Sequence, residues 1–216
     1  MNKFAKTALL IASFILGSLS VSEPAYTQSG DGEGTAHPQT GVIKGTVNAR
    51  AARYKENTVV YIDHVPGNFA PPETHPVVDQ QNLTFHPHVL VIVRGTTVDF
   101  KNSDTVRHNI FSPSPAADNM NLGTYGPGRV VPWTFNKIGE VVLLCNVHTE
   151  MFAWVIVRQN LYFSVTDRDG HFEIRDVPAG NYTLQVWNQK LSAEPQAITL
   201  RDGKYTHVSF DLVKKR

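Results

Sequence analysis

The chain has 216 residues, of which 41% are hydrophobic and 10% aromatic, enough apolar material to pack one large domain or two small ones. Its 20 Lys and Arg and 19 Asp and Glu leave a formal net charge of +1, which excludes an electrostatic argument for nucleic acid or an anionic membrane as partner. Thirteen prolines, fifteen glycines and many Val, Thr, Tyr and Phe favour short strands over helices. We therefore expect an all-β protein.

The first 22 residues are typical of a signal peptide. Lys3 and Lys6 precede an apolar run, 8–21, and small residues follow it. This run is short for a membrane span, which needs about 20 residues. We expect cleavage after Ser20 or Ser22, a periplasmic or secreted location and no membrane span after cleavage, with an uncleaved anchor as the alternative. Residues 23–40, rich in Gly, Ser and Thr, are expected to be a disordered linker.

Two groups of strands are expected between residues 41 and 158. The first group is 41–47 and 57–62, and a proline-rich stretch that cannot continue a central strand follows it. The Pro-, Gly- and Asn-rich stretch 113–129 is expected to be a loop. The second group comprises 77–80, 89–93, 97–101, 108–112, 130–135, 141–145 and 152–157.

The pattern changes after residue 158. Asp-Gly pairs at 169–170 and 202–203 predict hairpin turns, and 176–180 is expected to be another turn. The predicted strands are 162–166, 171–175, 182–187, 197–200 and 206–212.

The only cysteine lies in a sequence context that suits a metal ligand. A lone thiol in an exported protein indicates an intermolecular disulfide, a reactive thiol or a metal ligand. His148 and Met151 follow Cys145 at steps of three. Thiolate, imidazole and thioether select copper when a second histidine completes the set. The alternative is a buried cysteine with an incidental histidine and a core methionine.

Residues 76–158 resemble the blue-copper (cupredoxin) family, plastocyanin and amicyanin in particular. The resemblance rests on the segment 85–111, which starts Phe85-His-Pro-His-Val-Leu and ends His108-Asn-Ile-Phe, and on the Cys-x2-His-x2-Met spacing, which is similar to the short ligand loop of amicyanin. It implies a Greek-key β-sandwich that holds one type 1 copper. The ligands implied are His108, Cys145, His148 and Met151.

The same resemblance implies roles for residues around the ligands. Asn109 is expected to form hydrogen bonds behind them and to orient them. His148 would be the partly exposed edge through which electrons leave, inside an apolar patch for which Phe152, Pro113 and Pro127 are candidates. Asn146-Val147 stands where family members often have proline before the second histidine, which affects loop stiffness and copper potential.

The remaining histidines and acidic pairs are expected to have no metal role. His86 and His88 flank Pro87 without a further ligand, so a structural or exposed role is favoured over a second metal site. Asp167 and Asp169 could suggest calcium, but an Asp-Gly turn explains them. Four other histidines stand alone: His64, His75, His171 and His207.

Residues 166–187 resemble the carboxypeptidase regulatory-like family, a transthyretin-like β-sandwich. The opening half of that family's pattern is found far upstream, at Gly41-Val-Ile-Lys-Gly-Thr-Val47 and Asn57-Thr-Val-Val-Tyr-Ile62. We therefore expect a copper domain, 67–158, inserted between two parts of this sandwich, 41–66 and 159–216. The alternative is that 41–66 supplies extra strands to the copper domain.

The function expected from these features is a periplasmic carrier of single electrons rather than an enzyme, because no second copper cluster is visible. Its partner would be a redox protein such as a c-type cytochrome or a periplasmic dehydrogenase. Two alternatives remain open. One is copper storage, delivery or sensing without electron transfer, and the other is a non-redox structural β module.

Overall fold

The computed structural model describes residues 40–215, and their regular secondary structure is β-strand apart from two short 3-10 turns. The expected all-β class is therefore confirmed. The predicted signal peptide and all but the last residue of the predicted linker lie outside the described residues. Between residues 40 and 215, no helix is long and apolar enough to cross a membrane.

The middle of the chain forms a cupredoxin-like β-sandwich of two sheets. One sheet has the order β5 (Val89–Val93), β11 (Phe152–Arg158), β10 (Gly139–Leu144), β7 (His108–Phe111), β8 (Asn121–Tyr125). The other has the order β4 (Thr84–His86), β3 (Val77–Gln81), β6 (Thr97–Asn102), β9 (Val130–Thr134). Buried residues alternate along β6, so that Val98 and Phe100 join the core while Thr97 and Asp99 do not. This core lies directly behind the strand ends that carry the predicted ligands.

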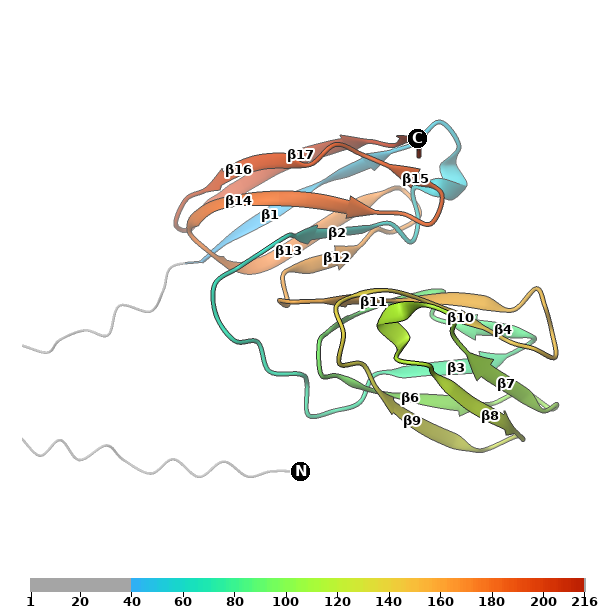
Figure 1. The fold of residues 1–216 in the computed structure, drawn as a ribbon. Helices are drawn as coiled ribbons and strands as arrows, with labels where there is room; N and C mark the ends of the chain where they lie inside the picture. The colour runs from blue at the N-terminus through green and yellow to red at the C-terminus, as the bar shows by residue number, and fades with distance from the viewer. Residues whose placement is uncertain (1–39, 216) are drawn as a thin grey trace, which may run out of the picture. The chain divides into compact units, whose positions relative to one another are not determined.

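A second β-sandwich is built from strands at both ends of the described chain. One sheet has the order β13 (His171–Pro178), β1 (Thr40–Asn48), β17 (Tyr205–Asp211). The other has the order β12 (Phe163–Val165), β2 (Val59–Ile62), β14 (Gly180–Trp187), β16 (Gln196–Leu200). In Figure 1, β1 lies beside β17 although the two are far apart in sequence. An insertion of the copper domain into this sandwich requires β1 and β2 to pair with strands that come after residue 158. The domain boundaries stay a prediction.

Gly45 explains part of the Gly41–Val47 motif. It lies between β13 and β17 in the middle of β1, and a Cβ atom added at Gly45 would lie 1.7 Å from the carbonyl oxygen of Val208. Only glycine allows the two backbones to approach so closely. The glycine in this motif is therefore required for β1 to pack against β17.

Most predicted strands are present within one or two residues, and the following stretches differ. The expected loop 113–129 contains a 3-10 turn, η2 (Pro115–Ala117), and strand β8. β8 is an exposed edge strand in which only Tyr125 is buried, so it lacks the apolar alternation that identifies strands. The expected turn 176–180 is mostly strand, because β13 continues to Pro178. The short β4 was not predicted. Nor was the two-stranded sheet of β15 (Leu191–Ser192) and β18 (Val213–Lys214).

A third apolar cluster joins the two sandwiches. On β11, Val155 faces the cupredoxin-like core, whereas the alternate residues Trp154 and Ile156 pack toward the other sandwich. The Trp154 and Trp187 rings meet edge to face, with centroids 5.3 Å apart. The buried members of this cluster are Val59, Tyr61, Val89, Val91, Ile156 and Trp187. The interface is therefore built from the outer faces of one sheet of each sandwich.

Candidate metal centre

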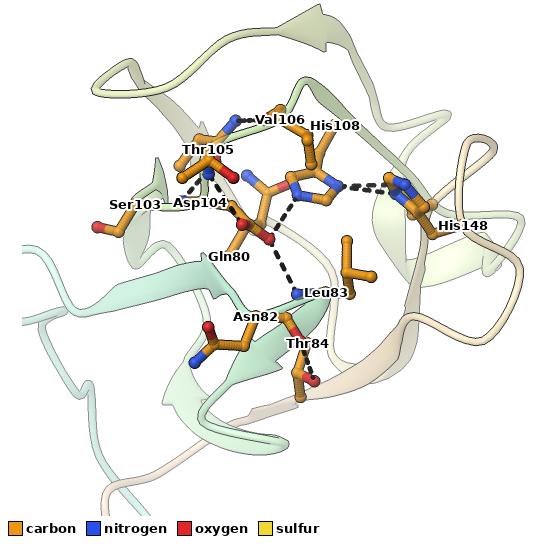
Figure 2. Close-up of polar contacts among 12 residues, drawn as sticks. Gln80, Asn82, Leu83, Thr84, Ser103, Asp104, Thr105, Val106, His108 and His148 are labelled. Carbon is orange, nitrogen blue, oxygen red and sulfur yellow. Dashed lines mark hydrogen bonds and ion pairs between the residues drawn. The ribbon is translucent and has the colours of Figure 1, made fainter.

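Three of the predicted ligands converge at one end of the cupredoxin-like sandwich. His108 is the first residue of β7, and Cys145 directly follows β10. The distance from Cys145 Sγ to His108 Nδ1 is 4.0 Å, and that to His148 Nδ1 is also 4.0 Å. The two Nδ1 atoms are 3.1 Å apart (Figure 2), and the two ring planes are tilted by 60°. His108 is fully buried and Cys145 is buried and unpaired, whereas His148 is half-buried.

These distances fit a single small metal ion. The point equidistant from the corners of a triangle with sides of 3.1, 4.0 and 4.0 Å lies about 2.2 Å from each corner, within the range of metal–imidazole and metal–thiolate bonds, about 2.0–2.3 Å. Such a point lies in the plane of the three donor atoms, so it offers trigonal coordination by two nitrogens and one sulfur. Trigonal His2Cys coordination is typical of blue-copper sites.

Asp104 fixes the orientation and tautomer of His108. Its Oδ2 atom lies 3.1 Å from His108 Nε2, on the side of the ring opposite the other ligands (Figure 2). A ring that donates its Nε2 proton to a carboxylate keeps the Nδ1 lone pair free for a metal. Asp104 was missed by the sequence analysis, although an acidic residue four before a candidate ligand is a signal that could have identified it.

Backbone donors hold the Asp104 carboxylate in place. Leu83 N donates to Oδ2 at 2.9 Å, and Thr105 N donates to Oδ1 at 2.8 Å. These two hydrogen bonds, followed by the contact with His108, lower the pKa of Asp104 below its ordinary value. The carboxylate is therefore charged at neutral pH and acts as a fixed acceptor for His108.

The loop that carries Asp104 is shaped by a buried asparagine. Asn102 is fully buried at the end of β6, and its Oδ1 accepts from Asp104 N at 3.0 Å. Its Nδ2 donates to the carbonyls of Val106, at 3.0 Å, and Tyr125, at 3.2 Å. Since one side chain satisfies three backbone groups, the loop has little freedom to move His108.

Asn109 links the first ligand strand to the ligand loop. Its Oδ1 accepts a hydrogen bond at 3.4 Å from the backbone N of Asn146, the residue after Cys145. Its Nδ2 donates to Asn121 Oδ1 at 3.2 Å. The side chain thus ties β7 to the residue that follows the thiolate. The expected role of Asn109 in orienting ligands of a bound metal stays a prediction.

Met151 closes the loop on the core side. It is almost fully buried, belongs to the same apolar cluster as Cys145, and its amide donates to His148 O at 3.0 Å. The hydrogen bond closes a turn that returns the chain from the half-buried His148 to the core. Its role as axial ligand stays a prediction.

Exposed apolar side chains surround this end of the sandwich. Val147 precedes His148, and Phe152, which was expected in the patch, follows Met151 with 40% of its surface exposed. Leu83, on the turn that donates to Asp104, and Val106, on the loop that carries Asp104, are also exposed and were not predicted. Pro113 and Pro127 are exposed, but no contact places them beside His148, so their membership stays a prediction.

The other histidines between residues 40 and 215 are not part of this group. His88 packs edge to face against Phe152, with ring centroids 5.1 Å apart, and His86 is exposed. His75 Nδ1 pairs with Asp99 Oδ1 at 3.0 Å. Asp167, Asp169 and His171 form a second group of potential ligands, and all three are exposed. Asp167 Oδ1 accepts from the amides of Asp169 and His171, which is the turn role expected of it.

Comparison with sequence families gives a partial match. Residues 143–208 match the model of polysaccharide lyase family 4, domain II. This is less than a third of the chain, so it does not assign the chain to that family. A search of curated proteins found no match.

Comparison with solved structures finds cupredoxins. A purple cupredoxin from Nitrosopumilus maritimus is 24% identical, with a TM-score of 0.35 over 38% of this chain and 98% of that chain. A mutant of amicyanin in its reduced state is 20% identical, with a TM-score of 0.38 over 41% of this chain and 92% of that chain. A copper-containing nitrite reductase from Thermus scotoductus SA-01 is 24% identical, with a TM-score of 0.39 over 53% of this chain and 28% of that chain. At these scores the likeness carries no argument for function, which has to rest on the geometry of the centre itself.

Proposed function

We propose that His108, Cys145 and His148 bind one copper ion as a type 1 site, with Met151 as a long axial ligand, and that the protein carries single electrons. The observation that carries this proposal is the triangle of two Nδ1 atoms and one Sγ atom, whose centre lies at bonding distance from all three. Copper would supply a one-electron couple, Cu(II)/Cu(I).

The surrounding residues support electron transfer because they hold the ligands in one geometry. Asp104 keeps His108 in the tautomer with a free Nδ1, Asn102 fixes the loop between them, and Asn109 fixes Asn146 beside the thiolate. A site that hardly changes shape between two oxidation states exchanges electrons with little reorganisation, and rigid support of this kind favours it.

His148 is the proposed route by which electrons leave the site. It is the one half-buried member of the triangle, and Val147 and Phe152 beside it are exposed. An apolar surface around a partly exposed ligand suits brief contact with a redox protein. We propose a c-type cytochrome or a periplasmic dehydrogenase as partner, with export directed by residues 1–22 and no enzymatic activity of the chain itself.

Copper titration followed by visible spectroscopy and voltammetry tests the proposal. Cu(II) is expected to bind one to one, to give an intense visible band from thiolate-to-copper charge transfer, and to be reduced and reoxidised reversibly. Cys145→Ser and His108→Ala are expected to lose the band. His75→Ala is the matched control, because this exposed histidine pairs with Asp99 outside the triangle.

Two results would contradict electron carriage. A colourless protein that holds only Cu(I) would indicate storage, delivery or sensing. Metal content that is unchanged in both Cys145→Ser and His108→Ala would indicate a structural β module.

A further inference from the structure

A groove at one end of the second sandwich has a chemical character unlike that of the metal centre. Its volume is about 540 Å³, within the usual range for small-molecule sites. Aliphatic side chains and one tyrosine ring form most of its wall, and two cations stand among them. The lining residues are Arg50, Ala51, Tyr54, Leu191, Leu212, Val213 and Lys214.

The walls of the groove are held together by one buried asparagine. Asn188, only 3% exposed, donates through Nδ2 to Tyr54 O at 3.1 Å, on the wall formed by η1 (Ala52–Tyr54). Its Oδ1 accepts from Lys190 N at 3.0 Å and Leu191 N at 3.1 Å, on the opposite wall. Because both walls depend on the same side chain, the groove is formed before any ligand arrives, and binding needs little ordering.

Positively charged side chains gather around this groove. Arg53 stacks on the Tyr54 ring, 4.7 Å from its centroid, and Arg53 and Lys190 both lower the pKa of the Tyr54 hydroxyl. Arg50 and Lys214 line the groove itself, and no carboxylate does. Within residues 40–215, none of these four cations forms an ion pair. The chain as a whole is nearly neutral, so this concentration of unpaired cations is local.

We infer that the groove binds an amphipathic organic anion of low molecular weight, with its apolar body against Leu191, Leu212 and Val213 and its acidic group beside Arg50 and Lys214. The apolar wall supplies affinity by burying hydrocarbon, and the cations select the charge of the head group. This site is independent of the metal centre, because it uses residues of the second sandwich alone.

Calorimetric titration of the full-length chain with decanoate, below the concentration at which decanoate forms micelles, tests the inference. Decanoate is expected to bind one saturable site. Decyltrimethylammonium, which has the same chain and the opposite charge, is expected to bind at least tenfold more weakly. Arg50→Glu/Lys214→Glu and Val213→Asp are each expected to weaken decanoate binding at least tenfold. Lys204→Glu, at an exposed cation outside the groove, is expected to leave it unchanged.

The variants are expected to fold, because Arg50, Val213 and Lys214 are all exposed. Circular dichroism and the melting temperature check this. Equal binding of the anion and the cation, or equal loss in Lys204→Glu, would overturn the inference. The inference would also be overturned if the protein failed to bind monomeric decanoate but sedimented with phosphatidylglycerol vesicles and not with phosphatidylcholine vesicles. The groove would then serve a membrane surface.

Discussion

His108 has two ring nitrogens, and its neighbours give them different tasks. Nδ1 faces Cys145 and His148 at 4.0 and 3.1 Å, whereas Nε2 faces the Asp104 carboxylate at 3.1 Å. The carboxylate therefore positions the ring and adds a negative charge one imidazole away from any metal held by the triangle. Charge of this kind favours the more positive oxidation state of a bound ion.

Asp104→Asn is expected to raise the reduction potential of the copper-loaded protein. The variant keeps an oxygen that can accept from His108 but loses the charge that stabilises Cu(II). For a partly exposed carboxylate at an effective dielectric constant near 20, the loss is on the order of 1 kcal/mol, or roughly 50 mV for one electron. Voltammetry measures this shift, and the visible band shows that the ligand set is intact.

Asp99→Asn provides the control, because it removes a charge that pairs with His75 instead. An equal shift in Asp99→Asn would mean that the effect is one of net charge. An unchanged or lowered potential in Asp104→Asn would contradict the role given to this carboxylate.

At the scale of an element, the turn between β3 and β4 carries backbone strain next to the metal centre. Asn82 and Leu83 have φ values of 53° and 57°, so both central residues of this two-residue turn are left-handed. Asn-Gly is the preferred pair for such a turn, and a bulky leucine is uncommon there. The Leu83 amide donates to Asp104, and its exposed side chain lies at the proposed docking end. The strain therefore occurs where a backbone donor and an apolar contact are both needed.

Leu83→Gly and Leu83→Ala form a matched pair that measures this strain. Both remove the side chain and keep the amide, but only glycine adopts the left-handed conformation without steric cost. The glycine variant is expected to be more stable than the alanine variant by about 1 kcal/mol, because relief of roughly 1–2 kcal/mol of strain exceeds the greater entropy of unfolded glycine. Urea denaturation gives the difference, and greater stability of the alanine variant would contradict it.

The sequence predicted strands where burial imposes a period of two and missed them where pairing alone forms the strand. β6 alternates buried and less buried residues and was located within one residue, whereas the edge strand β8 buries only Tyr125 and resembled a loop. The ligands followed from residue type and spacing. Asp104 did not, because its role depends on a loop folded around Asn102 and on a turn contributed by a different pair of strands.

At the scale of the whole described unit, the apolar cluster between the sandwiches couples two cores that sequence patterns treat as separate. Trp154 and Trp187 come from different sandwiches, and the Arg158 guanidinium lies 3.6 Å from the centroid of the Tyr61 ring across the same boundary. Contacts of this kind make independent unfolding of either sandwich costly, since it would expose the shared apolar surface.

Copper binding is therefore expected to stabilise both sandwiches although its proposed ligands lie in one. A ligand that binds only the folded state adds about 2.7 kcal/mol at a free concentration one hundred times its dissociation constant. In calorimetry, the unmodified protein is expected to show one transition that moves upward as a whole with copper. Trp187→Ala removes a buried ring from the interface, at a cost of about 3–5 kcal/mol, and is expected to split the transition into two, of which only one responds to copper. Two transitions in the unmodified protein, with copper shifting only one, would show that the sandwiches unfold independently despite the cluster between them.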